Sequence, residues 1–76
     1  MTLSEVEVAV LEFEHRRWNH PGAKDQAIHD TFGMSATRYY QLLDNLLNKA
    51  EALEHDPMLV KRLRRLRETR RRARTG

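Results

Sequence analysis

The stretch of sequence that decides the fold is DQAIHDTFGMSATRYYQLLD, residues 25–44. Apolar residues recur at helical spacing on both sides of Phe32-Gly33-Met34-Ser35, which predicts two short helices joined by a turn. Gly33 suits the left-handed end of the first helix, and Ser35 is a good N-cap for the second. Two helices that cross at a steep angle need such a tight turn, so the spacing predicts a helix-turn-helix.

Further helices are expected on the N-terminal side of this unit. Ser4 and Glu7 have the spacing of a capping box, and the apolar stripe behind them predicts a first helix over residues 5–18. Asn19-His20-Pro21-Gly22 predicts a turn, because proline fixes φ and glycine tolerates positive φ. The second helix is then expected over residues 23–32.

The C-terminal side also predicts helix. The third helix is expected to end near Asn48, and residues 49–55 to hold one short helical turn. Asp56-Pro57 is a start signal for a fourth helix, since aspartate is a good N-cap and proline fits the first helical position. Beyond Arg70 the apolar stripe stops, which predicts a frayed end in the absence of a partner.

These elements predict an all-α protein with a three-helix helix-turn-helix core and a basic C-terminal helix or tail. The helix-turn-helix domain is expected over residues 1–56 and the basic helix and tail over residues 57–76. Leu59, Leu63 and Leu66 mark one face of the last helix, which either packs back on the core or forms a dimer seam. Packing is favoured because two heptads are short for an independent coiled coil. The oligomeric state is accordingly expected to be a monomer or a weak homodimer.

The charge distribution is the second informative feature. Residues 1–55 carry five basic and nine acidic groups, a net charge of −4, whereas residues 56–76 carry nine basic and two acidic groups, a net charge of +7. A basic tail on an acidic body suggests a polyanionic partner that is reached mainly through the tail. A solvated charged helix is the alternative, but arginine dominates here, and its planar guanidinium suits phosphate.

Several classes of function are disfavoured. A chain of 76 residues has a thin core and little room for a deep catalytic cleft. It has no cysteine, and its four histidines lack metal-ligand spacing, so neither a metal nor another cofactor is expected. No set of nucleophile, base and orienting group is present, and we expect no enzyme and no small-molecule ligand. Its longest apolar run, Val8 to Leu11, is too short to span a membrane, and a cytoplasmic location is expected.

The aromatic and polar residues of the helix-turn-helix suggest how it would act. Trp18, Phe32 and Tyr39 lie at helical spacing and are expected in the core rather than stacked on bases. The start of the third helix is expected to enter the major groove of DNA, where Arg38 can reach guanine or phosphate and Gln41 can pair with adenine. The residues expected to contact DNA there are Ser35, Ala36, Thr37, Arg38, Tyr40 and Gln41. The C-terminal residues expected to contact phosphates or a minor groove are Lys61, Arg62, Arg64, Arg65, Arg70, Arg71, Arg72 and Arg74.

The stretch from Gln26-Ala27-Ile28 through Phe32 to Leu43 resembles a family of very small actinobacterial proteins with a single helix-turn-helix. The resemblance extends over almost the whole chain, including Asp56-Pro57 and the alternation of leucine and arginine after it. The same stretch is similar to the helix-turn-helix of sigma factors and related repressors. It departs from them at His29, since such units often have alanine five residues in. Some members of the small family are described as nucleoid-associated, so the resemblance implies chromosome-wide binding of double-stranded DNA.

We therefore expect a small nucleoid-associated or transcription-regulatory protein. Two alternatives stay open from the sequence. One is a module that docks on the transcription machinery through its acidic body, and the other is an arginine-rich protein that binds RNA by shape and single strands.

Overall fold

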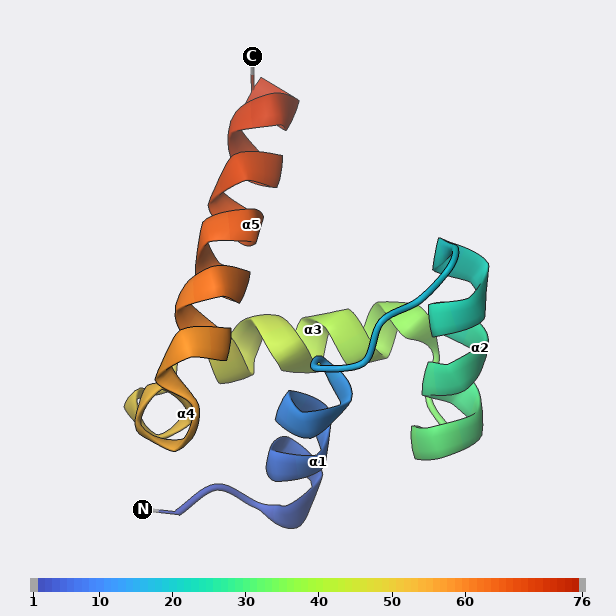
Figure 1. Cartoon of the computed structure of the whole chain (residues 1–76), viewed down its shortest axis with the longest axis horizontal. Coiled ribbons are helices and arrows are strands. Elements are labelled where there is room, and N and C mark those ends of the chain that lie inside the picture. The colour runs from blue at the N-terminus through green and yellow to red at the C-terminus, as the bar shows by residue number, and fades with distance from the viewer. Residues whose placement is uncertain (1, 76) are drawn as a thin grey trace.

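The structure is a computed structural model that describes the backbone of residues 2–75 and the side chains of residues 2–70. The described part of the chain is helical without any strand, so the all-α prediction is confirmed. Figure 1 shows α3 running across the molecule, with α2 near one of its ends and α5 rising from the other. The helices are α1 (Glu5–Phe13), α2 (Pro21–Phe32), α3 (Ala36–Leu47), α4 (Ala50–His55) and α5 (Pro57–Thr75).

The first helix begins as predicted but is shorter. Ser4 Oγ accepts a hydrogen bond from the Glu7 N–H at 3.1 Å and the Ser4 N–H donates to the Glu7 carboxylate at 2.9 Å, which completes the capping box. The predicted end at Trp18 is wrong, because α1 ends at Phe13. The chain then turns, and the Trp18 ring folds back to 5.3 Å from the Phe13 ring. That aromatic contact, rather than another turn of helix, brings Trp18 to the core.

The second helix begins two residues earlier than predicted. Pro21 and Gly22 are helical rather than part of a turn, because His20 caps the helix and its Nδ1 accepts a hydrogen bond from the Ala23 N–H at 3.2 Å. Proline is well suited to this first position, since its missing N–H would have no partner there. At the other end Gly33 has φ 67°, which confirms the predicted left-handed cap.

The remaining boundaries agree with the start signals in the sequence. Ser35 caps α3 by accepting from the Arg38 N–H at 3.2 Å, and Asp56 caps α5 by accepting from the Leu59 N–H at 3.4 Å. Asp56 also bonds His15 Nε2 at 2.6 Å, and this bond is the main reason that the pKa of Asp56 lies below its ordinary value. Residues 49–55 were expected to hold one short helical turn, and residues 50–55 form α4 with Lys49 as its N-cap.

Aromatic and aliphatic residues from all five helices form one core. Phe13 lies at its centre, with ring centroids 5.3 Å from Phe32 and 5.6 Å from Tyr39. The first turn of α5 adds Leu59 and Val60, both almost fully buried. Leu63 packs against the same core, but Leu66 is 46% exposed, so the predicted packing of this leucine stripe extends only to Leu63.

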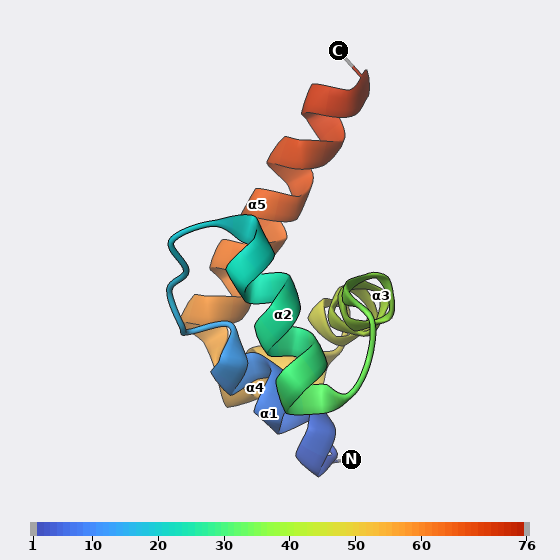
Figure 2. The ribbon, with the colours of Figure 1, turned by 90° about the vertical axis from the view of Figure 1, so that its right-hand side faces the viewer.

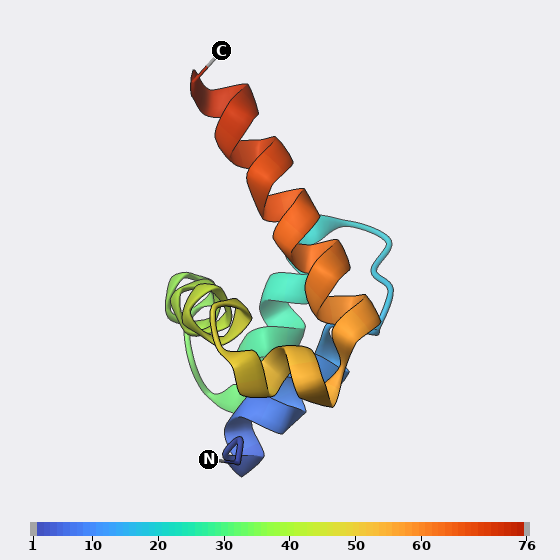
Figure 3. The same ribbon diagram turned by 90° about the vertical axis from the view of Figure 1, so that its left-hand side faces the viewer.

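The last helix continues further than predicted. Its helical backbone runs to Thr75 instead of fraying after Arg70, because arginine and alanine favour helix and no breaker precedes Gly76. In Figures 2 and 3, where α3 is seen nearly end-on, the C-terminal end of α5 leans toward the side on which α3 lies. None of the helices in the described residues is both long enough and apolar enough to cross a membrane.

Candidate nucleic-acid interface

The outer face of α3 is polar and accessible. The exposed residues of the helix and its C-cap carry one cation, one carboxylate and four neutral polar groups, and they are Thr37, Arg38, Gln41, Asp44, Asn45 and the C-cap Asn48. Thr37, Arg38 and Gln41 were predicted to lie here, and they are exposed. Ser35 is exposed as well, but its hydroxyl is occupied by the cap of α3, and Ala36 is half-buried. The face therefore offers amide and guanidinium groups that match the hydrogen-bonding edges of bases.

Tyr40 is only half-buried but does not belong to this outer face. Its ring lies edge-on to Tyr39, with centroids 5.2 Å apart, and Lys24 Nζ lies 5.3 Å from its centroid. Tyr40 therefore sits between α2 and α3, where Lys24 brings a cation that the sequence prediction did not include.

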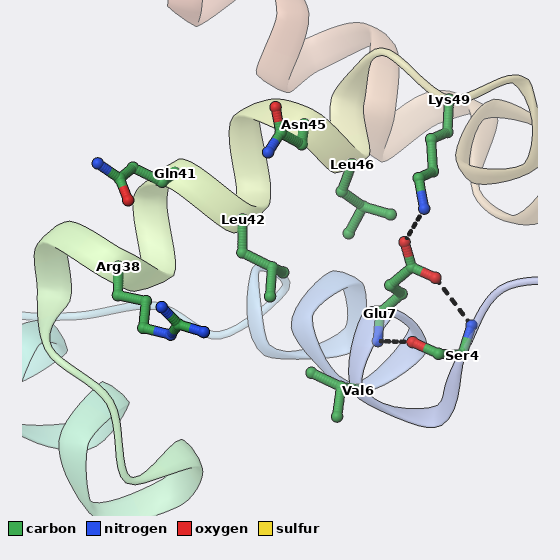
Figure 4. A pocket seen from close by; sticks show the side chains of 9 residues that line it. All are labelled: Ser4, Val6, Glu7, Arg38, Gln41, Leu42, Asn45, Leu46 and Lys49. Atoms are coloured by element: carbon green, nitrogen blue, oxygen red, sulfur yellow. Dashed lines mark hydrogen bonds and ion pairs between the residues drawn. The ribbon is translucent and has the colours of Figure 1, made fainter.

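A shallow pocket of about 490 Å³ lies between α1 and the outer face of α3. Val6, Leu42 and Leu46 supply its apolar lining, and Arg38, Gln41 and Asn45 lie along its α3 side. Figure 4 shows Lys49 reaching across to Glu7, while Gln41 points away from α1. Hydrogen bonds from Lys49 and from Ser4 hold the pKa of Glu7 below its ordinary value, so this carboxyl of α1 is charged at neutral pH, where it faces Lys49 at the start of α4.

A buried polar cluster fixes α3 relative to the helices behind it. The Tyr39 hydroxyl donates to the Glu14 carboxylate, and Lys24 Nζ lies 3.0 Å from the same carboxylate. Glu14 directly follows α1, Lys24 is on α2 and Tyr39 is on α3, so three segments meet at one carboxylate. Burial, followed by the bond to Glu14, raises the pKa of Tyr39 above its ordinary value. The hydroxyl is therefore protonated at neutral pH and can donate to Glu14.

Two arginines of α5 are structural. Arg64 Nε donates to the Leu47 carbonyl at 2.6 Å, and Arg67 donates to the Asp44 carbonyl at 3.3 Å. Both carbonyls belong to the last turn of α3, where helical C=O groups lack partners along the helix. Arg64 was predicted to contact DNA, and its side chain is partly buried with its Nε bonded to α3. The two contacts join α5 to the last turn of α3.

The other predicted cations of α5 fall into two groups. Lys61, Arg62 and Arg65 are exposed, and their side chains make no hydrogen bond or ion pair with α3 among the described residues. Arg70 is exposed and, with Arg67, Lys24 and Tyr40, lines a small pocket of about 60 Å³ between α5 and α3. The side chains of Arg71, Arg72 and Arg74 lie outside the described residues, although their backbone continues α5.

The structure thus brings Arg70 near α3 and separates Lys61, Arg62 and Arg65 from it. Sequence reasoning missed Asn45, although it lies one turn after Gln41 and the period of the helix could have found it. It also missed Lys24 and Lys49, whose placement depends on contacts between helices.

The comparisons with known proteins add a family and nothing about activity. No curated protein and no solved structure matches the chain. The model of a family described as "Protein of unknown function (DUF3263)" matches residues 2–75. Since that match covers nearly all of the 76 residues, the chain belongs to the DUF3263 family.

Proposed function

We propose that this chain binds double-stranded DNA, with α3 as the recognition helix of a helix-turn-helix and the C-terminal half of α5 as a phosphate-binding arm. The observation that carries the proposal is the arrangement of these two elements on one side of the molecule. In Figures 2 and 3 the arginine-rich end of α5 leans toward the side of α3. A non-enzymatic role as a nucleoid-associated or transcription-regulatory protein follows from the same proposal.

The chemistry of α3 supports contact with bases. Arg38, Gln41 and Asn45 succeed one another along its exposed face, at intervals of three and four residues. Arginine can form two hydrogen bonds with guanine, and glutamine or asparagine can form two with adenine, all in the major groove. The buried cluster at Glu14 and the contacts of Arg64 hold this helix in place, which reduces the entropy lost on binding.

The chemistry of α5 supports contact with phosphates. Residues 70–74 hold four arginines, and the body up to residue 55 has a net charge of −4. The body is repelled by DNA at long range, so the affinity must come from the basic C-terminal region that contains these four arginines. Contacts of this kind position a protein on the duplex without selecting the sequence.

The experiment is fluorescence anisotropy with duplex DNA and with structured RNA, each over a series of salt concentrations. Truncation after Thr69 removes four cations and leaves the described core intact. We expect weaker binding to every duplex, and a slope of log affinity against log salt that is shallower by up to about 3–4 units. Replacing the same four arginines with lysine is the matched control, and most of the slope should remain.

Arg38→Ala tests the recognition helix on the duplex that the protein prefers in a selection from random sequences. We expect a loss of about 1–3 kcal/mol on that site and a smaller loss on unrelated duplexes. Arg16→Ala is the control, because this exposed arginine lies over the Trp18 ring, in a loop on the opposite side of the molecule from α3. Tighter binding to RNA than to duplex would favour the RNA alternative, and binding to neither would favour docking on a protein.

A further inference from the structure

Part of α5 lies outside its C-terminal half, which we propose as the phosphate-binding arm. Met58 is 84% exposed, the highest value among the large hydrophobic residues that the structure describes as exposed. Lys61, Arg62 and Arg65 follow it at three, four and seven residues, so the four side chains share one face of the helix. We call these four residues the outer face of α5. It consists of one solvent-exposed apolar side chain beside three cations.

A groove of complementary character lies elsewhere on the same chain. It has a volume of about 350 Å³ and runs between α4 and the segment that leads into α1. Leu3 and Val8 give it an apolar, partly buried lining, and Glu51 and Glu54 supply carboxylates. We call it the acidic groove, and its lining residues are Thr2, Leu3, Val8, Glu51, Glu54 and His55.

The charges of the two surfaces are not neutralised within one molecule. Among the described side chains, Glu51 and Glu54 form no ion pair, and neither do Lys61, Arg62 and Arg65. The two surfaces share no residue, so one copy can offer its outer face to a neighbour while its groove is occupied by another.

We propose that the acidic groove of one copy binds the outer face of α5 of a second copy, with the apolar Met58 side chain inserted into the groove. An apolar side chain that fits a pocket elsewhere on the same molecule produces a head-to-tail contact. The three cations around Met58 fit the carboxylates of the groove. Repulsion between like charges disfavours pairing of groove with groove and of outer face with outer face.

The contact is small, because the outer face covers about two turns of one helix and the groove is shallow. Interfaces below about 1,200 Å² are usually weak and transient. Copies held side by side on one DNA molecule meet at a much higher effective concentration, so a contact that is weak in solution becomes cooperative binding there. The cooperativity rests on the proposed DNA binding, whereas the contact between copies does not.

The test begins without DNA, by sedimentation velocity up to millimolar protein at low and at high salt. Met58→Asp damages the outer face, and Glu51→Lys/Glu54→Lys damages the groove, while neither variant alters a residue assigned to DNA binding. Glu12→Lys/Asp25→Lys is the control, since both acids are exposed, lie outside the groove and make the same change in net charge. Circular dichroism verifies that every variant is folded.

We expect the average mass of the native chain and of the control to rise with concentration at low salt, and the rise to disappear at high salt. Each of the two damaging variants should stay monomeric alone. Their mixture should form pairs that grow no further, because one copy retains a good outer face and the other a good groove. A native chain that is monomeric at millimolar concentration, a damaging variant that still associates, or a mixture without pairs would overturn the proposal.

Binding to DNA then separates this inference from the proposed function. On a duplex long enough for one copy, Met58→Asp should bind about as tightly as the native chain, and Glu51→Lys/Glu54→Lys at least as tightly, because it adds positive charge. On a long duplex the native chain should bind cooperatively and the variants should not. Self-association without any DNA binding would refute the proposed function and leave the contact between copies standing, and non-cooperative DNA binding by the native chain would refute the contact.

Discussion

Tyr39→Phe tests whether the buried cluster at Glu14 holds α1, α2 and α3 together. The substitution removes one hydroxyl from a fully buried ring and leaves its aromatic packing unchanged. The Glu14 carboxylate, itself buried, then keeps Lys24 as its only partner among the described side chains. A buried carboxylate that loses a donor keeps its desolvation cost and loses the bond that offset it.

The expected magnitude follows from the type of bond. A hydrogen bond to a charged acceptor contributes about 1.5–3 kcal/mol, and burial of Glu14 favours the upper part of this range. One kcal/mol shifts the melting temperature of a domain of this size by about 4–8 °C, so we expect a decrease on the order of 10 °C.

The assay is thermal unfolding followed by circular dichroism at neutral pH, with Tyr40→Phe as the matched control. Tyr40 neighbours Tyr39 on the same helix, is half-buried, and its hydroxyl makes no hydrogen bond to the described residues. Its loss should change the melting temperature little. Equal melting temperatures for the two variants would refute the reasoning, because the bond between Tyr39 and Glu14 would then contribute nothing to stability.

Three further substitutions test individual contacts. Arg64→Gln should destabilise the fold by about 1–2 kcal/mol through loss of its bond to α3, whereas the exposed neighbour Arg65→Gln should stay within about 0.5 kcal/mol in urea unfolding. Asp56→Asn should lower the free energy of unfolding at neutral pH. Its difference in unfolding free energy from the native chain should shrink as pH falls below about 4, because a carboxyl with a lowered pKa stabilises the fold only while it is ionised. A difference that is constant with pH would contradict this. Gly33→Ala should cost about 1 kcal/mol from its left-handed backbone alone, since an added Cβ would meet nothing within 4 Å, while Gly22→Ala in the first turn of α2 should be neutral or stabilising.

Local signals in the sequence were sufficient to predict much of the secondary structure. Ser4, Gly33, Ser35 and Asp56 act through hydrogen bonds or dihedral angles of their own neighbourhood, and all four were placed correctly. The polar face of α3 follows from helical periodicity in the same way, because exposure along a helix repeats with its turn. The charge asymmetry between body and tail is a property of the sequence and needs no structure.

The roles of individual charged residues were decided only by the tertiary structure. Arg64 and Arg65 are adjacent and identical in type, yet one caps the end of α3 and the other faces solvent. Trp18 reaches the core by a turn rather than by continuing α1, and Glu14 is buried because Tyr39 and Lys24 converge on it from other helices. Composition and spacing determine which residues can carry charge or form helix. The packing angle between helices determines which charges meet a partner, since it depends on side-chain shapes far apart in the chain.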